Sequence, residues 1–194
     1  RGCTDLKRLA RLLKRCLVLG GIGATVAYMA LYVAPLPAPP AASPVPESTK
    51  ILDREGRLLY DSAGPGDVHH TYVPIQEIPE RLKQAVVATE DASFYSNPGV
   101  DLQAIARAAL TDLRAGELRQ GGSTITQQLA RNLYFAPEER SSASPLRKIS
   151  EIALALRLDR SMSKDEILEQ YLNRVYLGNL AYGVEAASRT YFAK

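Results

Sequence analysis

The feature that most constrains this chain is a long run of residues without charge. Residues 16–34 contain no Asp, Glu, Lys or Arg. A helix of this length is about 30 Å long, which matches the hydrocarbon core of a bilayer. The run therefore predicts one transmembrane helix and separates the chain into segments on opposite sides of a membrane.

The basic side chains before this run predict its orientation. Six of them precede it, against the single acid Asp5: Arg1, Lys7, Arg8, Arg11, Lys14 and Arg15. The positive-inside rule then predicts that residues 1–15 form a cytoplasmic tail and that the rest lies outside the cytoplasmic (inner) membrane, in the periplasm. A cleavable signal peptide is the competing interpretation. The anchor is favoured because the apolar run is longer than a usual signal-peptide core and prolines follow it.

Residues 35–50 read as a Pro-rich linker, because six prolines lie between Pro35 and Pro46. In the polyproline form this stretch reaches no more than roughly 40 Å, which would hold the following domain near the membrane. That domain, residues 51–194, is nearly neutral although the whole chain has a net charge of +3. Its charge therefore gives no case for nucleic-acid binding.

Cysteine and histidine are scarce. Cys3 and Cys16 both fall in or beside the basic segment, so neither a disulfide framework nor a thiolate metal site is expected in the domain. The two histidines, His69 and His70, are adjacent and cannot share one face of a helix or strand. We expect both to be exposed loop residues.

The domain reads as a short hairpin followed by helices. The stretch 51–60 predicts two strands joined by a turn at Gly56. A first helix is expected from Pro79 to Glu90, with one apolar face. Further helix starts are expected at four capping signals: Asp101, Thr124 with Gln127, Ser144-Pro145, and Ser163 with Glu166. A polar loop is expected before Ser144.

Glu90 and Asp91 form a pair of carboxylates at the end of the first predicted helix, before a sharp turn at Asn97-Pro98-Gly99. A carboxylate where a helix gives way to a loop is a common catalytic acid or base. From the residues alone, the choice between acid and base stays open.

The stretch 121–132 is dense in hydrogen-bonding groups: two glycines precede a helix start that carries hydroxyl and amide side chains. Such a start can bind an anion. An ordinary capped helix after a flexible loop is an equally good interpretation.

Glu151 is the second acid candidate. Arg147 lies four residues before it, as in an ordinary surface ion pair. The predicted helix is nevertheless apolar on nearly all sides, with Leu154 on the side of Glu151 and Leu146 and Ile149 on the other, which predicts burial. A buried carboxylate there is expected to face a partner or a cleft.

Ser161 and Lys164 have the Ser-x-x-Lys spacing of penicillin-reactive serine enzymes, but neither a Lys-Thr-Gly nor a Ser-x-Asn element accompanies them. We interpret this stretch as a turn between helices.

In this order the motifs resemble family 51, the peptidoglycan glycosyltransferases found as the amino-terminal domain of class A penicillin-binding proteins and as monofunctional transglycosylases. The matching elements are Glu90-Asp91 with Phe94, Gly99 and Asp101; residues 121–132; Arg147-Lys148 with Glu151; residues 164–173; and Val175-Tyr176-Leu177-Gly178 with Gly183 and Ala186-Ala187. The resemblance implies a mainly α, lysozyme-like helical domain with a small β-hairpin at its start, preceded by one transmembrane helix. The implied enzyme polymerises lipid II into glycan strands on the outer face of the membrane.

The resemblance also implies roles and partners. Glu90 would be the general base, and Glu151 the second carboxylate, near the diphosphate. The substrate-binding set would be Asp91, Phe94, Ser123, Thr124, Gln127, Gln128, Arg131, Asn132, Arg147 and Lys164. No cofactor is required, and Mg²⁺ or Mn²⁺ near Glu151 is left open. The expected partners are lipid II, the growing lipid-linked glycan, the membrane and other cell-wall synthesis proteins.

Three positions depart from the family pattern: Asn97 stands where histidine is common, Arg131 where lysine is common, and Ala143 where arginine is common. Family members also continue past Lys194, so a C-terminally truncated domain is expected, and a following transpeptidase domain is left open. Two other functions stay open: a lysozyme-like lytic enzyme that cleaves glycan, and a membrane-tethered scaffold without activity. A lytic enzyme would need a protonated glutamate and no cations for a diphosphate.

Overall fold

The computed structural model describes residues 14, 19–23, 25, 26, 29, 37, 47–62, 68–115, 122–141 and 144–193. It divides into two units, residues 1–35 and residues 36–194. In the first unit the described residues are helical. Most of the predicted anchor (16–34) and of the predicted linker (35–50) lies outside the described residues. Within the described part of the chain, no helix is both long enough and apolar enough to span a membrane.

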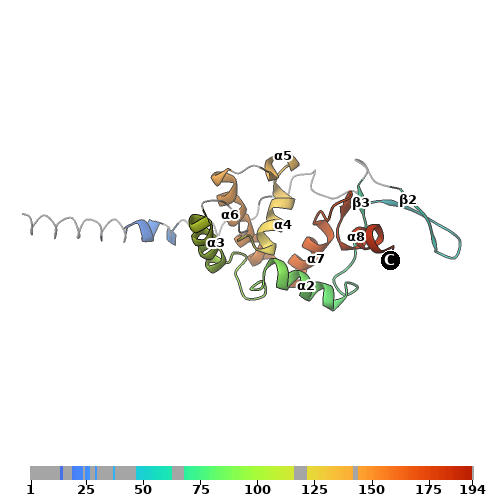
Figure 1. The fold of residues 1–194 in the computed structure, drawn as a ribbon, viewed down its shortest axis with the longest axis horizontal. Coiled ribbons are helices and arrows are strands. Elements are labelled where there is room, and N and C mark those ends of the chain that lie inside the picture. Colours follow the sequence, from blue (N-terminus) through green and yellow to red (C-terminus); the bar gives the residue numbers. More distant parts are fainter. Residues whose placement is uncertain are drawn as a thin grey trace, which may run out of the picture. The chain divides into compact units, whose positions relative to one another are not determined.

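The second unit begins with the predicted hairpin. Strands β1 (Thr49–Leu52) and β2 (Leu58–Ser62) pair antiparallel, with Ile51 opposite Tyr60. The Asp53 carboxylate closes the turn, because its Oδ1 accepts hydrogen bonds from the backbone N–H groups of Glu55 and Arg57. The hairpin projects from the helical body (Figure 1).

The remainder is mainly helical, as predicted. Its helices are α2 (Glu80–Glu90), α3 (Leu102–Ala115), α4 (Ile125–Tyr134), α5 (Pro137–Arg140), α6 (Pro145–Ser161), α7 (Lys164–Arg174) and α8 (Val184–Phe192). The short helix α5 lies in a stretch that we predicted to be a loop. Pro79 precedes α2 as its N-cap residue and is not its first helical residue.

The core forms around α4, which packs against both α6 and α7 (Figure 1). The side chains that α4 contributes, Ile125 and Leu129, are fully buried. The neighbouring helices contribute equally buried leucines, such as Leu156 on α6 and Leu168 on α7. Because α4 is central, its amino-terminal end is fixed in position, and the functional residues gather around that end.

The predicted caps explain why these helices begin where they do. Thr124 Oγ1 accepts from the backbone N–H of Gln127, and Gln127 Oε1 accepts from the backbone N–H of Thr124. Ser163 and Glu166 form the same reciprocal pair at the start of α7. Each pair satisfies two N–H groups that a helix start leaves without partners.

The expectation that both histidines are exposed loop residues is wrong: both lie in a strand and His69 is half-buried, and the difference is greatest for His70. Its side chain is buried, and Nε2 hydrogen-bonds the backbone oxygen of Asn173 at 2.8 Å. The cause is a strand pair that the sequence did not predict: β3 (His69–His70) pairs in parallel with β4 (Ala181–Tyr182). This pairing brings the beginning of the domain against its end and covers His70.

Two predicted apolar faces do not enter the core. No residue of α2 is buried, and its apolar face lines a cavity described below. At the start of α6, Leu146 and Ile149 are exposed, so only the later part of that helix is enclosed by protein.

Candidate active site

Glu90 is the last residue of α2, and its carboxylate is exposed. Gln128 on α4 donates a hydrogen bond from Nε2 to Glu90 Oε2 at 2.8 Å. Glu90 lines two separate cavities, of about 240 Å³ and about 500 Å³. Glu90, the first candidate for an acid or base, therefore borders both cavities.

Eight of the twelve residues that line the smaller cavity are polar or charged. Its lining includes Thr89, Glu90, Asp91, Ser93, Asp101, Arg107, Ser123 and Thr124. We call it the polar hollow. Ser123 connects it to the second predicted acid, because Lys148 Nζ donates to Ser123 Oγ at 2.9 Å and to Glu151 Oε1 at 2.6 Å.

The larger cavity is lined mainly by apolar groups, from α2, α7, the segment after α7 and the start of α8. Its lining is Leu82, Ala85, Val86, Thr89, Glu90, Gln128, Tyr171, Leu172, Val175, Tyr176, Leu177 and Val184. We call it the apolar hollow. The face of α2 that we predicted to be apolar is thus turned inward, but toward open space and not toward packed protein.

Glu151 is fully buried on α6 between two cations. Arg147 Nη1 lies 2.7 Å from Glu151 Oε2, and Lys148 Nζ lies 2.6 Å from Glu151 Oε1. The two cations outweigh the one carboxylate, so the three side chains carry a net charge of about +1. Lys148 is 37% exposed and the charged group of the three most open to solvent. The cluster can therefore bind an anion next to Ser123.

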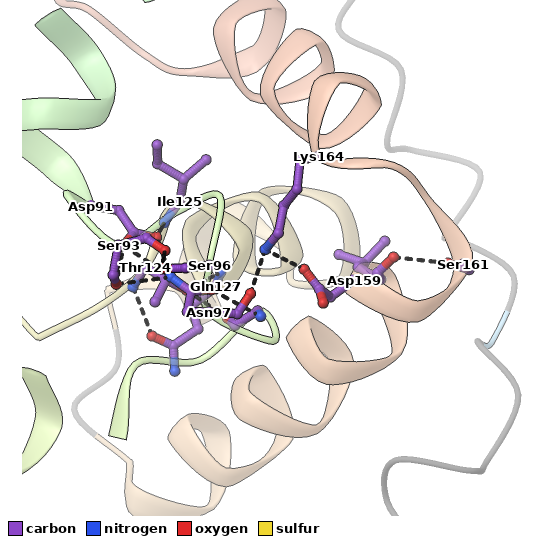
Figure 2. A network of polar contacts seen from close by, with 12 residues as sticks. Asp91, Ser93, Ser96, Asn97, Thr124, Ile125, Gln127, Asp159, Ser161 and Lys164 are labelled. Carbon is purple, nitrogen blue, oxygen red and sulfur yellow. Dashed lines mark hydrogen bonds and ion pairs between the residues drawn. The ribbon is translucent and has the colours of Figure 1, made fainter. Parts of the chain in front are cut away.

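Asp91, which we expected to bind substrate, is buried and holds the turn after α2. Its Oδ2 accepts from the backbone N–H of Ile125 at 3.2 Å, and its two oxygens accept from Asn97 Nδ2 at 3.0 and 3.1 Å. Ser93 Oγ donates to Asp91 Oδ1 as well. Figure 2 shows these contacts converging on the start of α4. Asp91, the residue that follows Glu90, thus ties the end of α2 to the start of α4.

Asn97 completes the turn from the other side. Its Oδ1 accepts from the backbone N–H of Gly99 at 2.9 Å, and Thr124 Oγ1 donates to the backbone oxygen of Gly99 at 2.7 Å. The side-chain amide of Asn97 can donate to Asp91 and accept from Gly99 at the same time, because it has a donor end and an acceptor end. The family departure at Asn97 therefore leaves the turn with a full set of hydrogen bonds.

Lys164 does not lie with the other cations, contrary to our expectation. Its Nζ donates to the backbone oxygen of Asn97 at 2.6 Å and to Asp159 Oδ1 at 2.5 Å (Figure 2). It also lies 4.9 Å from the centre of the Phe94 ring. Asp159 is eight residues beyond Glu151 on α6, about 12 Å along the helix. Lys164 thus braces the turn and not the anion-binding cluster.

Three other expected substrate contacts are also buried. Phe94 is fully enclosed in the core, and Thr124 and Gln127 are occupied by the cap of α4. Phe94 and Gln127 line neither hollow and can only shape the site from behind, whereas Thr124 is part of the lining of the polar hollow. Ser123 and Gln128 are half-buried and do border the hollows.

Arg131 and Asn132 lie further along α4, and both are half-buried. The charge of Arg131 opposes the rise in the pKa of Tyr171, which lines the apolar hollow. The backbone oxygen of Asn132 accepts from Arg140 Nη2 at 2.9 Å. Ala143, the third family departure, and Gly121 lie outside the described residues.

The Ser-x-x-Lys match is a turn, as we interpreted it. Ser161 Oγ donates to the backbone oxygen of Leu158, while Lys164 contacts Asn97 and Asp159. Ser163 between them is the cap of α7.

A divalent cation does not fit the side chains around Glu151. Both oxygens of that carboxylate are engaged by cationic groups, and Mg²⁺ or Mn²⁺ would need oxygen ligands. In the part of the chain that the structure describes, no group of three or more His, Cys, Asp or Glu side chains could hold a metal ion.

Two cationic residues at the site were missing from the predicted set. Lys148 was passed over although it lies three residues before Glu151, a spacing that puts both on one side of a helix. Arg107 was passed over because nothing in the local pattern shows that α3 borders the polar hollow.

The fold and the site define a mainly helical domain in which an exposed carboxylate lines a hollow, and Ser123 on the same lining contacts a cation cluster. A family described as Transglycosylase matches residues 55–194. The chain belongs to this transglycosylase family, which confirms the resemblance noted in the sequence and its class of enzyme, a glycosyltransferase.

Individual relatives agree with this assignment. Penicillin-binding protein 1A of Aquifex aeolicus is 47% identical over 149 residues, which cover 77% of this chain and 20% of that protein. Penicillin-binding protein 1A of Escherichia coli is 46% identical over 145 residues, covering 75% and 16%. Penicillin-binding protein 1F of Bacillus subtilis is 41% identical over 151 residues, covering 76% and 20%. The chain spans no more than about a fifth of the length of these relatives.

Proposed function

We propose that this chain is a peptidoglycan glycosyltransferase that polymerises lipid II. The donor is the growing glycan on its lipid diphosphate, and the acceptor is the 4-hydroxyl of an incoming lipid II. The observation that carries the proposal is that Glu90 and Ser123 line the same hollow, and Ser123 is the hydrogen-bond partner of Lys148. The proposed proton acceptor thus lines a space whose Ser123 is in contact with the proposed anion-binding cation.

Glu90 acts as the general base. One of its oxygens takes the proton of the 4-hydroxyl while the hydroxyl oxygen forms a bond to the anomeric carbon of the donor. The bond from that carbon to the diphosphate oxygen breaks, and the electron pair leaves with the diphosphate. Attack from the side opposite the leaving group inverts the anomeric carbon.

Lys148 stabilises the leaving diphosphate, with Arg147 behind it. Diphosphate is a good leaving group once its charge is balanced, so the reaction needs cations near the donor more than a strong acid. Glu151 positions both cations by ion pairs on its two oxygens. Arg107 on the wall of the polar hollow adds a further positive charge.

The proposal gives no step to a metal ion. Arg147 and Lys148 supply the positive charge that a divalent cation would otherwise bring to the diphosphate. Polymerisation by the full chain is expected to stay within about twofold when EDTA replaces added Mg²⁺. A loss greater than tenfold, restored by Mg²⁺, would contradict this assignment.

A membrane location is part of the proposal. Residues 16–34 anchor the chain in the membrane, and residues 1–15 stay in the cytoplasm. Residues 35–50 link the anchor to the domain, residues 51–194, which acts on the outer face. Other cell-wall synthesis proteins are its partners there. The uncharged run and the basic residues before it support this topology. Protease added to spheroplasts should digest the domain and leave the basic tail protected.

The test of function is to incubate the full chain with lipid II in detergent and, separately, with finished glycan strands. Glycan polymer is expected from lipid II, and Glu90→Gln is expected to abolish it while the circular dichroism spectrum stays unchanged. Cleavage of finished glycan without polymer from lipid II would establish the lytic alternative. Full activity in Glu90→Gln would remove Glu90 from the role of base.

A further inference from the structure

Two adjacent glutamines at the start of α4 have separate positions. Gln127 is fully buried, and its Oε1 is held by the backbone N–H of Thr124 in the helix cap. Gln128, turned about 100° around the helix, is half-buried and borders the apolar hollow. Only the second of the two glutamines therefore faces Glu90.

The orientation of the Gln128 amide is fixed by its two partners. Nε2 donates to Glu90 Oε2 at 2.8 Å, and Oε1 accepts from the hydroxyl of Tyr171 at 3.2 Å. A flipped amide would bring its oxygen against the carboxylate oxygen of Glu90, with two acceptors facing each other. The Tyr171 hydroxyl must then be the donor to Gln128.

Tyr171 is suited to remain a donor. It lies on α7 and is only 3% exposed. Burial first, and then the negative charge of Glu90, raise the pKa of Tyr171 to about 12, while Arg131 opposes the rise. Its hydroxyl therefore keeps its proton throughout the range in which such an enzyme works, and the amide is oriented in one way only.

The contact engages one oxygen of Glu90. Among the residues that the structure describes, no group hydrogen-bonds the other oxygen, Oε1. An amide also fixes the carboxylate without adding a positive charge beside it. The base is thereby held in place while one oxygen stays open to a substrate proton.

We propose that Tyr171 is a positioning residue that acts on Glu90 through the Gln128 amide. The chain of contacts runs from α7 through α4 to the end of α2, and it fixes Glu90 Oε2 so that Oε1 faces the acceptor hydroxyl. This inference rests on the proposed role of Glu90 as the base. Tyr171 itself does not touch the reacting atoms.

The test is a double-mutant cycle in the full chain with lipid II, with kcat and KM measured separately. Tyr171→Phe removes the hydroxyl and keeps the ring. We expect it to lower kcat about fivefold, with KM within about twofold, because one neutral hydrogen bond is lost. Gln128→Ala is expected to lower kcat more, and adding Tyr171→Phe to it should change kcat by less than about twofold.

The matched control is Tyr72→Phe. Tyr72 also donates its hydroxyl to a residue of α7, Glu169, but it lines neither hollow. This variant should lose thermal stability to a similar degree and keep kcat. Equal losses of kcat in the two phenylalanine variants would show a merely structural effect and overturn the proposal.

The outcomes separate this inference from the proposed function. If Glu90→Gln is inactive but Tyr171→Phe reduces kcat by the same factor with and without Gln128, the positioning role is wrong and Glu90 remains the base. If Glu90→Gln retains full activity, the proposed function loses its base and the positioning role falls with it.

A second variant keeps the test decisive if Tyr171→Phe does not fold. Incorporation of 3,5-difluorotyrosine at position 171 keeps the hydroxyl and lowers its pKa into the measurable range. The groups that face it are Glu90 from α2 and Arg131 from α4. Ionisation would remove the donor, so kcat should fall as pH rises, at a lower pH than in the unmodified protein. An unchanged pH profile would overturn the proposal.

Discussion

Asn97 Nδ2 donates hydrogen bonds to both carboxylate oxygens of Asp91, at 3.0 and 3.1 Å, and both side chains are buried. Asp91 directly follows Glu90 and also accepts from the start of α4. The pair thus connects the end of α2, the tight turn and the central helix, and the stability of this connection can be measured.

Asn97→Ala is expected to lower the free energy of unfolding by about 2 kcal/mol, because a buried carboxylate loses a donor. Asn97→Asp should cost more, since it places a second carboxylate against Asp91. The matched control is Ser96→Ala in the same turn, where an exposed hydroxyl donates to a backbone oxygen; its cost should stay within about 0.5 kcal/mol. Urea unfolding compares the three, and equal costs for the two alanine variants would contradict the role of Asn97.

Lys148→Met is expected to lower kcat for polymerisation about a hundredfold, because the proposed leaving diphosphate would lose a cation that stabilises it. Glu151 keeps its contact with Arg147, so the fold should survive, which a thermal melt can check. Lys83→Met is the control, since Lys83 pairs with Glu80 on the surface of α2. Comparable losses in both variants would argue against a specific role for Lys148.

His70 makes the stability of the domain depend on pH. Burial lowers the pKa of His70 below its usual value near 6.5. The unfolded chain therefore binds a proton at a higher pH than the folded chain does, and stability is lost as pH falls below about 6.5. His70→Gln should flatten the pH dependence of thermal unfolding between pH 7.5 and 5.0, while His69→Gln should leave it intact. A dependence that persists in His70→Gln would place its origin elsewhere.

Gly99 and Gly56 separate two costs of a side chain. Both have a positive φ, +84° and +80°. A Cβ at Gly99 would lie 2.7 Å from the backbone oxygen of Ala155, whereas a Cβ at Gly56 would meet nothing within 4 Å. Gly56→Ala should cost about 1 kcal/mol of backbone strain. Gly99→Ala should cost at least about 3 kcal/mol in denaturant unfolding, because the clash adds to the strain; similar values would mean that the turn can move away from α6.

The helices could be predicted from the sequence because their signals are local. Thr124 with Gln127 and Ser163 with Glu166 lie within one helical turn of each other, so the spacing alone implies the contacts. The pairing of His69–His70 with Ala181–Tyr182 has no such signal, since it joins distant parts of the chain. The burial of His70 and the bracing role of Lys164 both depend on contacts of that long-range kind.

The apolar face of α2 shows a different limit. Periodicity predicts that Leu82 and Val86 share one face of α2, and both line the apolar hollow. It does not show whether the space they face is filled by protein or left open beside Glu90. A similar limit applies to Phe94 and Gln128, which both belong to family motifs. Phe94 is enclosed in the core and Gln128 borders the apolar hollow, and the motifs do not distinguish the two cases.

The end of α2 has a consequence for the evolution of this domain. The helix ends on Glu90 with Asp91 as its cap residue, and its last turn has no basic residue. Negative charges at a helix carboxyl end oppose the helix dipole. The same position that exposes the proposed base therefore weakens the helix that carries it, so Glu90→Gln should melt at a slightly higher temperature than the active protein. Activity and stability are in direct conflict at this one residue, and only selection for activity would keep the glutamate there.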